Sequence, residues 1–395
     1  MKKIKLLHFF APLRFGGGES FMVDFLRASA SSFDNKMALF SSSEAFTREL
    51  NAIGGVAETT QLLASDAGTG LRSSYKRLFL RILSHPVKVV SFLRKNSDYD
   101  FIVGHGFPFN FILPMLKFCG FIKNDKKMIY YQYHRLMNSS GSLLQRIVYR
   151  RLFARFDMIW ADSGDVRNDI LKMDKSLAPK IVIFSCSLDF GHIQDLAKEK
   201  LSTDFTTPKD RVVSVYPARF IPHKNHGVFV KILARLKEAG NIDNFFAIFS
   251  AGSNEVQKQF HDDLVRGGYE KNFLLPDKLS YGDLLHFLGS SNVCLFPSLE
   301  EGFGLGILEA LVLGVPVVCF RKVITPELNA FTMAVDTEEE FIDRACKLIS
   351  DPGALAEATK TARDRYEELR KAFDLRETSV RLQDTLAKFL ESASG

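Results

Sequence analysis

Short apolar runs alternate with longer segments of helical periodicity along most of the chain. The apolar runs predict strands, and their lack of a polar face is typical of parallel strands covered by helices on both sides. The predicted strands span residues 4–10, 37–41, 59–63, 101–103, 128–133, 157–162, 181–184, 211–217, 245–250, 272–275, 293–296 and 315–320. The predicted helices span residues 20–30, 163–173, 283–290, 305–313, 339–350 and 352–370, with another from residue 373 onward. This alternation predicts an α/β fold built on parallel sheets.

A polar stretch without clear periodicity, residues 192–209, divides this series and ends at Pro208. A chain of 395 residues is long enough for two or three domains, each with its own core. We therefore expect two Rossmann-like domains facing a central cleft, the first over residues 1–190 and the second over residues 205–373.

Composition indicates a globular protein of a reducing compartment. Apolar residues make up 46% of the chain and charged residues 25%. The five cysteines include no C-x-x-C pair, as expected for packing thiols rather than disulfides or zinc ligands. The first ten residues are basic and then apolar, but the short run without a cleavage site favours a strand over a signal peptide. No run reaches the roughly 18 uncharged residues of a membrane-spanning helix, so we expect a cytoplasmic protein.

The segment from Asn292 to Phe320 carries the densest chemical signal. A short apolar strand leads into Glu300-Glu301-Gly302-Phe303-Gly304-Leu305-Gly306, where an apolar helix begins. Its three glycines let the backbone approach a ligand closely, and the N–H groups of a helix N-terminus attract anions. The loop therefore predicts a cradle for a phosphate or a polarised sugar oxygen. Glu301 and Glu309 flank it at the carboxyl edge of a parallel sheet, where open α/β folds bind ligands.

Glu301 and Glu309 lie within P-S-x-x-E-G-F-G-x-x-x-L-E-A-x-x-x-G-x-P-V-V, which closely resembles the signature of family 4 glycosyltransferases. These are retaining enzymes of the GT-B fold that use nucleotide sugars. About a dozen positions agree in order, whereas a bare pair of glutamates at this spacing would mean little. The simpler alternative is that Glu301 caps a helix and Glu309 makes a surface ion pair.

A basic turn at the start of the second domain is the next candidate. Arg219 and Lys224 follow the predicted strand 211–217, within a stretch that resembles the R-x-x-x-x-K-N/G turn of the same family. Two cations five residues apart on one loop can converge on a diphosphate, the guanidinium as a fork and the ammonium as a point charge. A solvated basic loop is the alternative.

The first domain holds two further candidates. Gly16-Gly17-Gly18-Glu19 lies between a strand and a helix, where anions bind, but it fails the G-x-G-x-x-G dinucleotide pattern. It resembles the G-G-x-E turn that faces the transferred sugar and the acceptor in family 4 enzymes. His134 ends the strand 128–133 and should face the cleft, where the resemblance implies a hydrogen bond to the donor sugar. His105 is a weaker candidate, and both histidines could instead be structural.

The resemblance implies that the second domain binds a nucleotide sugar, that the first binds the acceptor, and that helix 374–395 crosses back to the first domain. It implies transfer of a hexose with retained configuration, without a metal or another cofactor. The catalytic candidates are then Glu301, His134, Arg219 and Lys224. The substrate-binding candidates are Gly16, Gly17, Gly18, Gly252, Phe303, Gly304, Leu305, Gly306 and Glu309.

We expect the acceptor to be a glycan or a lipid-linked glycan, as in bacterial surface polysaccharide or lipopolysaccharide assembly, because the first half of the chain is basic. Two loops depart from the family pattern. Ser185-Cys186-Ser187-Leu188-Asp189 stands where many relatives read P-N-G-V-D, and Pro276-Asp277-Lys278-Leu279 lacks the glycine of the loop that frames the base. A sugar-nucleotide epimerase of similar fold, which needs no acceptor, and a non-catalytic sugar-nucleotide binder are the alternatives.

Charge is divided unevenly along the chain. The first 190 residues have a net charge of about +11 and the remainder about −5, which points to an anionic partner for the first half. Residues 72–95 set apolar side chains at helical spacing among lysines and arginines. Such a stretch can lie on an anionic bilayer, at the inner face of a membrane, or pack its apolar stripe on its own sheet. No exposed aromatics interleave with the cations as in nucleic-acid binders, so we expect no nucleic-acid partner.

Asp98-Tyr99-Asp100 is a D-x-D sequence. In GT-A transferases this motif follows a strand and holds a metal. Here it precedes the predicted strand 101–103, so we expect a strand-entry turn and no metal site.

Overall fold

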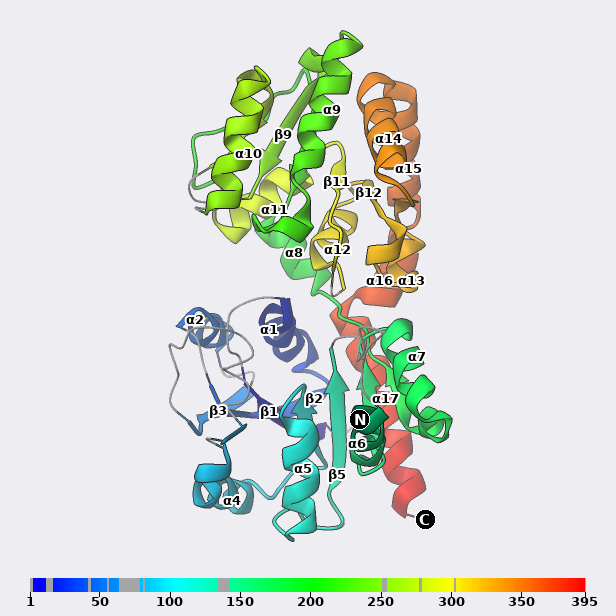
Figure 1. Cartoon of the computed structure of the whole chain (residues 1–395). Coiled ribbons are helices and arrows are strands. Elements are labelled where there is room, and N and C mark those ends of the chain that lie inside the picture. Colours follow the sequence, from blue (N-terminus) through cyan, green and yellow to red (C-terminus); the bar gives the residue numbers. More distant parts are fainter. Residues whose placement is uncertain are drawn as a thin grey trace. The chain divides into compact units, whose positions relative to one another are not determined.

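The computed structural model describes residues 3–11, 17–41, 44–54, 57–63, 79–80, 82–133, 143–250, 254–276, 279–301 and 303–394. The chain forms two compact units (Figure 1). Unit 1 consists of residues 1–187 together with residues 375–395, and unit 2 consists of residues 188–374. Each unit is a parallel sheet covered by helices, as the alternation of apolar runs and helical segments predicts.

The sheet of unit 1 has seven parallel strands in the order β3-β2-β1-β4-β5-β6-β7. These strands are β1 (Ile4–Phe10), β2 (Phe33–Leu39), β3 (Ala57–Gln61), β4 (Phe101–His105), β5 (Lys127–Gln132), β6 (Met158–Ala161) and β7 (Ile181–Ile183). The strand order reverses between β1 and β4. The carboxyl ends of these two strands therefore form the switch point at which open α/β sheets bind ligands.

The helices of unit 1 include one from the far end of the sequence. They are α1 (Gly17–Ser29), α2 (Glu44–Ala52), α4 (Pro86–Lys95), α5 (Phe109–Phe118), α6 (Leu143–Phe153), α7 (Gly164–Met173) and α17 (Leu375–Ser394). The terminal helix α17 packs against α1 and β1, and the Phe389 ring lies 6.1 Å from that of Phe101. The terminal helix thus belongs to the first unit, as the family resemblance implies.

The described residues of unit 2 form six parallel strands. They are β8 (Val212–Tyr216), β9 (Phe245–Phe249), β10 (Phe273–Leu274), β11 (Cys294–Phe296), β12 (Val317–Phe320) and β13 (Met333–Val335). The sets β10-β9-β8 and β11-β12-β13 are joined by a parallel bridge between Ser214 and Val293. The order is therefore β10-β9-β8-β11-β12-β13, which reverses between β8 and β11 just as unit 1 reverses between β1 and β4.

The helices of unit 2 surround this sheet. They are α8 (Phe190–Leu196), α9 (Gly227–Glu238), α10 (Glu255–Arg266), α11 (Tyr281–Gly289), α12 (Leu305–Val312), α13 (Pro326–Asn329), α14 (Glu338–Ser350), α15 (Pro352–Asp364) and α16 (Tyr366–Phe373). Helix α12 is buried along most of its length, from Ile307 to Val312, as its nearly uniform apolar sequence predicts.

The interpretation of residues 192–209 as a linker is wrong at its start. Helix α8 occupies residues 190–196, and its Phe190 and Ile193 side chains are buried where it packs against α11 and α12. A seven-residue helix with two buried positions is too short to give a clear periodic signal. The predicted helix 352–370 is likewise two helices, α15 and α16, which meet at Arg365.

Within the described ranges, no helix combines the length and apolar character that crossing a bilayer would require. The cysteines are free thiols, and Cys294 and Cys319 are buried in the sheet of unit 2. Burial raises the pKa of the Cys319 thiol to about 11, so the neutral thiol packs as a small apolar side chain.

Candidate functional site

The turn after β8 and the loop after β11 meet at the switch point of unit 2. The backbone N–H of Leu299 donates a 2.7 Å hydrogen bond to the carbonyl of His223. The Ser298 hydroxyl lies 3.4 Å from the same carbonyl. These bonds fasten two segments about 75 residues apart in the sequence. The side chains that follow in each segment are thereby held on the same edge of the sheet.

Lys224 and Glu301 form an ion pair across this junction. The Lys224 ammonium lies 2.5 Å from Oε1 of Glu301, and only 13% and 11% of the two side chains are exposed. The Tyr216 hydroxyl donates a 2.6 Å hydrogen bond to the backbone carbonyl of Lys224. Burial, reinforced by the Glu301 carboxylate, raises the pKa of Tyr216 well above its ordinary value, so this donor stays protonated. The structure thus brings two of the predicted site residues into direct contact.

Arg219 lies on the same turn but is placed differently. Arg219 lies three residues after the end of β8 and is exposed. No carboxylate in the described part of the chain forms an ion pair with its guanidinium. An anion arriving at the switch point therefore meets one cation already paired with a glutamate and a second, exposed cation on the same turn.

Two glycines place the N-terminus of α12 against the sheet. Gly304 precedes α12 with φ of +97°, a conformation that favours glycine. A Cβ on Gly306 would lie 3.1 Å from both the Phe296 ring and the Pro217 side chain. Gly306 therefore lets α12 pack closely on the ends of β8 and β11. The first N–H groups of α12, including that of Leu305, lack acceptors within the helix and carry its positive partial charge.

The Phe303 side chain packs in the protein core rather than on an open surface. Its side chain is 4% exposed, and its ring lies 5.8 Å from that of Phe373. Phe303 is one of the predicted substrate-binding residues. Because its ring is buried, it can contact a ligand through its backbone but not through its ring.

Glu309 accepts a hydrogen bond of 2.7 Å from the Tyr281 hydroxyl. Glu309 lies on α12 and is 9% exposed, whereas Tyr281 is the first residue of α11 and is 43% exposed. Tyr281 was not among the residues predicted from the sequence. No local signal marks it, because the contact joins residues 28 positions apart through the packing of two helices.

Several predicted site residues lie outside the described residues: Gly16, His134, Gly252, and Gly302 of the glycine-rich loop. Gly17 and Gly18 open helix α1. A Cβ on Gly18 would meet no heavy atom within 4 Å, so the structure leaves room beside the backbone at this position.

His105 belongs to a buried chain of hydrogen bonds at the switch point of unit 1. His8 Nδ1 lies 2.8 Å from His105 Nε2, and His8 Nε2 lies 3.1 Å from Oδ1 of Asn35. The Tyr133 hydroxyl bonds to His105 Nδ1. Burial lowers the pKa of His8 to about 4 and that of His105 well below its ordinary value, so both rings are neutral at pH 7.

The acceptor Oδ1 of Asn35 determines the direction of this chain. Because a carbonyl oxygen only accepts, the proton of neutral His8 lies on Nε2, and His8 Nδ1 must accept from His105 Nε2–H. His105 Nδ1 then accepts from the Tyr133 hydroxyl. Both ring nitrogens of His105 are thus engaged within unit 1. The sequence identified His105 as a weaker candidate and missed His8 and Tyr133, because nothing in a strand's sequence reveals which residue its neighbour presents.

The D-x-D sequence ties two strands together. Asp98 forms an ion pair with the Lys5 side chain, and Oδ2 of Asp100 accepts a 2.9 Å hydrogen bond from the Lys5 backbone N–H. The described residues contain no group of three or more His, Cys, Asp or Glu side chains that could hold a metal ion.

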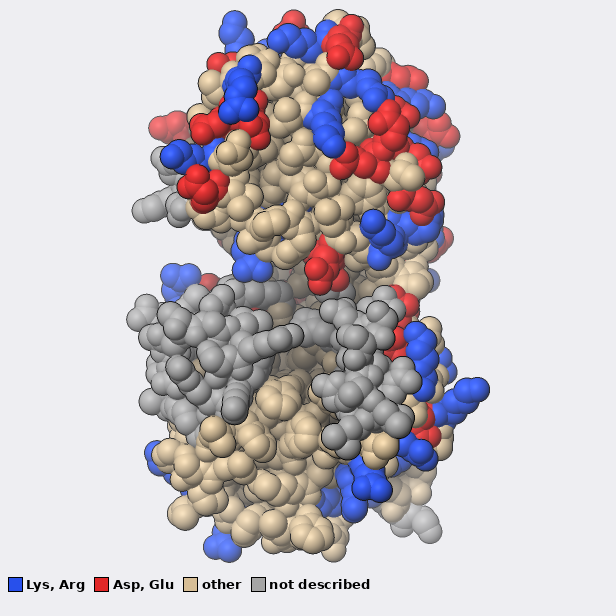
Figure 2. All heavy atoms as spheres, in the orientation of Figure 1, with Lys and Arg blue, Asp and Glu red and all other residues tan. Residues whose placement is uncertain are grey.

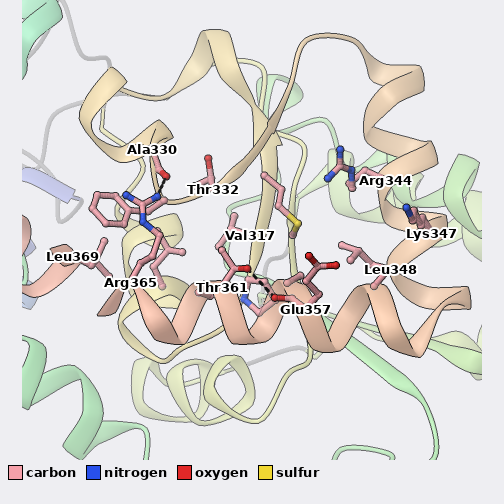
Figure 3. A pocket seen from close by; sticks show the side chains of 17 residues that line it. Val317, Ala330, Thr332, Arg344, Lys347, Leu348, Glu357, Thr361, Arg365 and Leu369 are labelled. Atoms are coloured by element: carbon pink, nitrogen blue, oxygen red, sulfur yellow. Dashed lines mark hydrogen bonds between the residues drawn. The ribbon is translucent and has the colours of Figure 1, made fainter. Parts of the chain in front are cut away.

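A pocket of about 300 Å³ lies elsewhere in unit 2, between α14, α15 and residues 330–333 (Figure 3). Arg365 lies at one end, where it donates a hydrogen bond to the carbonyl of Ala330, and Arg344 and Lys347 lie at the other. None of the predicted site residues lines this pocket. It is therefore separate from the junction of Lys224 and Glu301.

Comparisons with known proteins bear on both units. Residues 197–365 match the family model described as glycosyl transferases group 1. An uncharacterized glycosyltransferase of Methanocaldococcus jannaschii is 22% identical over 263 residues, 63% of each chain. A GDP-Man:Man(3)GlcNAc(2)-PP-Dol alpha-1,2-mannosyltransferase of Mus musculus is 22% identical over 238 residues, which cover 54% of this chain. The matched segments span 63% and 47% of these relatives' own lengths.

Solved structures match nearly the whole chain. Anabaena HepE in complex with UDP and glucose matches with a TM-score of 0.70 and 17% identity, over 98% of this chain and 100% of that one. A glycosyltransferase of Rickettsia africae matches with a TM-score of 0.74 and 14% identity, over 99% of both chains. The comparisons thus show that the fold is GT-B and that residues 197–365 match the model of glycosyl transferases group 1.

Proposed function

We propose that the protein is a retaining, hexosyltransferase-type glycosyltransferase that moves a sugar from a nucleotide sugar to a glycan or lipid-linked glycan. The observation that carries this proposal is the contact of Lys224 with Glu301 at the switch point of unit 2. A cation and a carboxylate held there, beside the N-terminus of α12, suit a ligand that joins a diphosphate to a sugar.

The cations would stabilise the leaving group. Cleavage of the anomeric bond places negative charge on the diphosphate that departs. Arg219, Lys224 and the first N–H groups of α12 would stabilise that charge from fixed positions, which requires little reorganisation during the reaction. The proposed reaction therefore uses protein cations where other transferases use a metal ion.

Glu301 has two parts in this proposal. Its contact holds the Lys224 ammonium in place, and its carboxylate can accept bonds from sugar hydroxyls and stabilise positive charge that develops at the anomeric carbon. The anomeric carbon loses its bond to the diphosphate oxygen and gains one to the acceptor oxygen on the same face. The acceptor proton passes to the departing phosphate, which conserves atoms and charge. Glu309 would accept bonds from the ribose hydroxyls.

Two observations favour a particular donor and a particular class of acceptor. Uracil is the first base to test, as a UDP-sugar, because the similar Anabaena structure is described as a complex with UDP. The net charge of about +11 over the first 190 residues favours an anionic acceptor, such as a glycan carried on a lipid phosphate. Assembly of a surface polysaccharide or lipopolysaccharide at the cytoplasmic side of a membrane is the process proposed.

A thermal-shift panel of UDP-, GDP-, ADP- and dTDP-sugars would test donor binding. One of these donors should raise the melting temperature, and Lys224→Ala should abolish the shift. Lys231→Ala is the matched control, because Lys231 pairs with Glu338 on the surface of the same unit. Failure of all four donors to bind would contradict the proposal.

Product analysis would then separate the enzymatic alternatives. With acceptor present, the new linkage should keep the anomeric configuration of the donor, as measured by NMR coupling constants, and EDTA should leave the rate unchanged. If, without an acceptor, the donor became a sugar nucleotide with one stereocentre of the sugar inverted, the protein would be an epimerase instead. Tight donor binding without hydrolysis or transfer to any acceptor would identify a binding protein.

A further inference from the structure

The outer faces of three helices in unit 1 expose large apolar side chains. Phe118 of α5 is 87% exposed and Val87 of α4 is 78% exposed. Figure 2 shows an expanse of uncharged surface over this part of unit 1. We call this surface the α4–α6 face, and define it by Phe79, Leu80, Leu83, Val87, Phe107, Phe111, Met115, Phe118, Phe121, Ile147, Val148 and Tyr149.

Ring contacts show that the face is continuous. The Phe107 ring lies 6.4 Å from Phe79 and 5.9 Å from Phe111. The Phe111 ring lies 6.5 Å from Tyr149 of α6. A chain of aromatic side chains thus connects the segment before α4 with α5 and α6. Contiguous apolar surface of this kind usually marks an interaction site, whereas single exposed apolar residues do not.

The sequence of α5 explains why this face is apolar. Phe109, Ile112, Leu113 and Leu116 point into the core beneath the helix. Phe111, Met115 and Phe118 recur at helical spacing on the other side, where a surface helix normally carries polar residues, and Phe107 precedes the helix. Lys117 is the only charged residue in α5. The helix is therefore apolar on both sides although only one side is covered by its own sheet.

The charges on these helices have a single sign. Together α4, α5 and α6 contain no aspartate or glutamate. Their charged residues are Lys88, Arg94, Lys95, Lys117, Arg146, Arg150 and Arg151. Lys117 and Arg150 form ion pairs with Asp157 and Asp174, which lie outside these helices. The cations of the three helices outnumber these two carboxylates, so the border of the apolar face keeps a net positive charge. Such a face complements a surface with an apolar interior and anionic groups at its edge.

We propose that the α4–α6 face docks on an anionic lipid bilayer. The aromatic side chains enter the headgroup and acyl boundary, and the lysines and arginines bind lipid phosphates. A symmetric pairing with a second copy fits less well, because the cations of these helices outnumber their carboxylate partners Asp157 and Asp174, and the pairing would bring the excess positive charge of both copies together. A bilayer supplies both the apolar phase and the counter-charge.

This inference goes beyond the proposed function, because docking requires neither a donor nor transfer. It also extends the contact beyond residues 72–95 to α5 and α6. Residues 64–78 and 81 lie outside the described residues, and the proposal does not depend on them. Of the predicted stretch, residues 79–80, 82–84 and α4 contribute Phe79, Leu80, Leu83 and Val87. The core of the face is α5, which the sequence analysis did not identify as a membrane contact.

Vesicle flotation of the full chain tests the proposal. The protein should float with vesicles of phosphatidylcholine mixed with phosphatidylglycerol, and binding to phosphatidylcholine alone should be at least about tenfold weaker. Raising the salt concentration should weaken binding. Phe118→Glu and Val87→Glu should each lower binding by about tenfold, with unchanged circular dichroism, because both side chains are exposed.

Val265→Glu is the matched control, since Val265 is 40% exposed on α10 of unit 2 and the substitution adds the same charge. Equal flotation of Phe118→Glu, Val87→Glu and the control would overturn the proposal, as would absence of binding to anionic vesicles. Sedimentation equilibrium provides the second readout. A dimer that Phe118→Glu dissociates, in a chain that binds no vesicles, would assign the face to a second copy. Because none of these measurements uses a sugar nucleotide, a failed activity assay leaves their outcome intact.

Discussion

The hydroxyl of Tyr281 donates a hydrogen bond of 2.7 Å to Oε1 of Glu309, the carboxylate that we propose accepts bonds from the ribose. Tyr281 is nearly half exposed, whereas Glu309 is buried. The tyrosine therefore bonds to an oxygen that, under our proposal, would accept a bond from the ribose. A ligand hydroxyl that bonds to this oxygen would either share it with Tyr281 or displace the tyrosine hydroxyl.

Tyr281→Phe should lower the stability of the ligand-free protein and increase the stabilisation by donor. Loss of one bond to a buried carboxylate costs about 1–3 kcal/mol. A ribose hydroxyl that bonds to Glu309 would then restore what the substitution removed. Thermal shifts with and without the donor measure both effects. Tyr366→Phe is the control, because it removes a 2.9 Å hydrogen bond with Gln194 and should lower stability alone. A smaller donor shift in Tyr281→Phe would mean that the tyrosine instead assists binding.

Breaking the contact of Lys224 with Glu301 should affect stability and activity together. Lys224→Ala or Glu301→Gln leaves a mostly buried partner without its counter-charge, at a cost of about 1–3 kcal/mol. Transfer should fall by roughly 10²-fold or more, because fixed charges near the leaving group are lost.

The matched controls are Lys231→Ala and Glu338→Gln, which break an exposed pair of the same type. They should change stability by less than about 0.5 kcal/mol and leave activity unchanged. Denaturant unfolding and initial rates provide the comparison. Full activity in Lys224→Ala would remove the basis for the proposed donor site.

The glycines before and within α12 should resist substitution for different reasons. Gly304→Ala forces a side chain into φ of +97°, which costs about 1–2 kcal/mol. Gly306→Ala places a Cβ 3.1 Å from Phe296 and Pro217, so α12 must shift outward from the sheet. Both variants should weaken donor binding, because the N-terminus of α12 moves.

Gly227→Ala is the control for these variants. It lies at the start of α9, where a Cβ would meet nothing within 4 Å, and it should be neutral or stabilise the protein by up to about 1 kcal/mol. Unchanged donor affinity in Gly306→Ala, measured by calorimetry, would argue against a role for the α12 N-terminus.

Acid should destabilise the protein through His8. Burial lowers its folded pKa to about 4, whereas the unfolded pKa is near 6.5. Between these values the unfolded chain binds a proton that the folded chain excludes, so stability falls as pH decreases from 6.5 to 4. Excluding this proton lowers the free energy of unfolding by about 3 kcal/mol below pH 4, and the effect vanishes above pH 6.5.

Denaturant unfolding at several pH values would measure this slope. His8→Gln should reduce the slope between pH 6.5 and pH 4 but not abolish it, because burial lowers the pKa of His105 and of His226 as well. His261→Gln, at a half-exposed surface histidine, is the control. An identical slope in His8→Gln and in the unsubstituted chain would show that His8 does not control the acid response.

The positions of Lys224 and Glu301 could be anticipated because they are set by local signals and chain order. Each follows a short apolar strand, and consecutive parallel strands direct their carboxyl ends to the same edge of a sheet. The same rule places His105 at the edge of unit 1. It does not say which neighbouring side chain each residue meets.

Periodicity, glycines and strand ends predict the alternation of strands and helices, the two Rossmann-like units and the loops that carry the proposed site, because these are local features of the chain. The folded arrangement was needed to identify the partners, Tyr281 for Glu309 and His8 and Tyr133 for His105, and the exposure of Phe118. Such contacts join residues far apart in the chain through packing, which leaves no local pattern. An apolar helix such as α5 has the same sequence whether one side or both are covered, so only its position on the sheet shows that half of it faces outward.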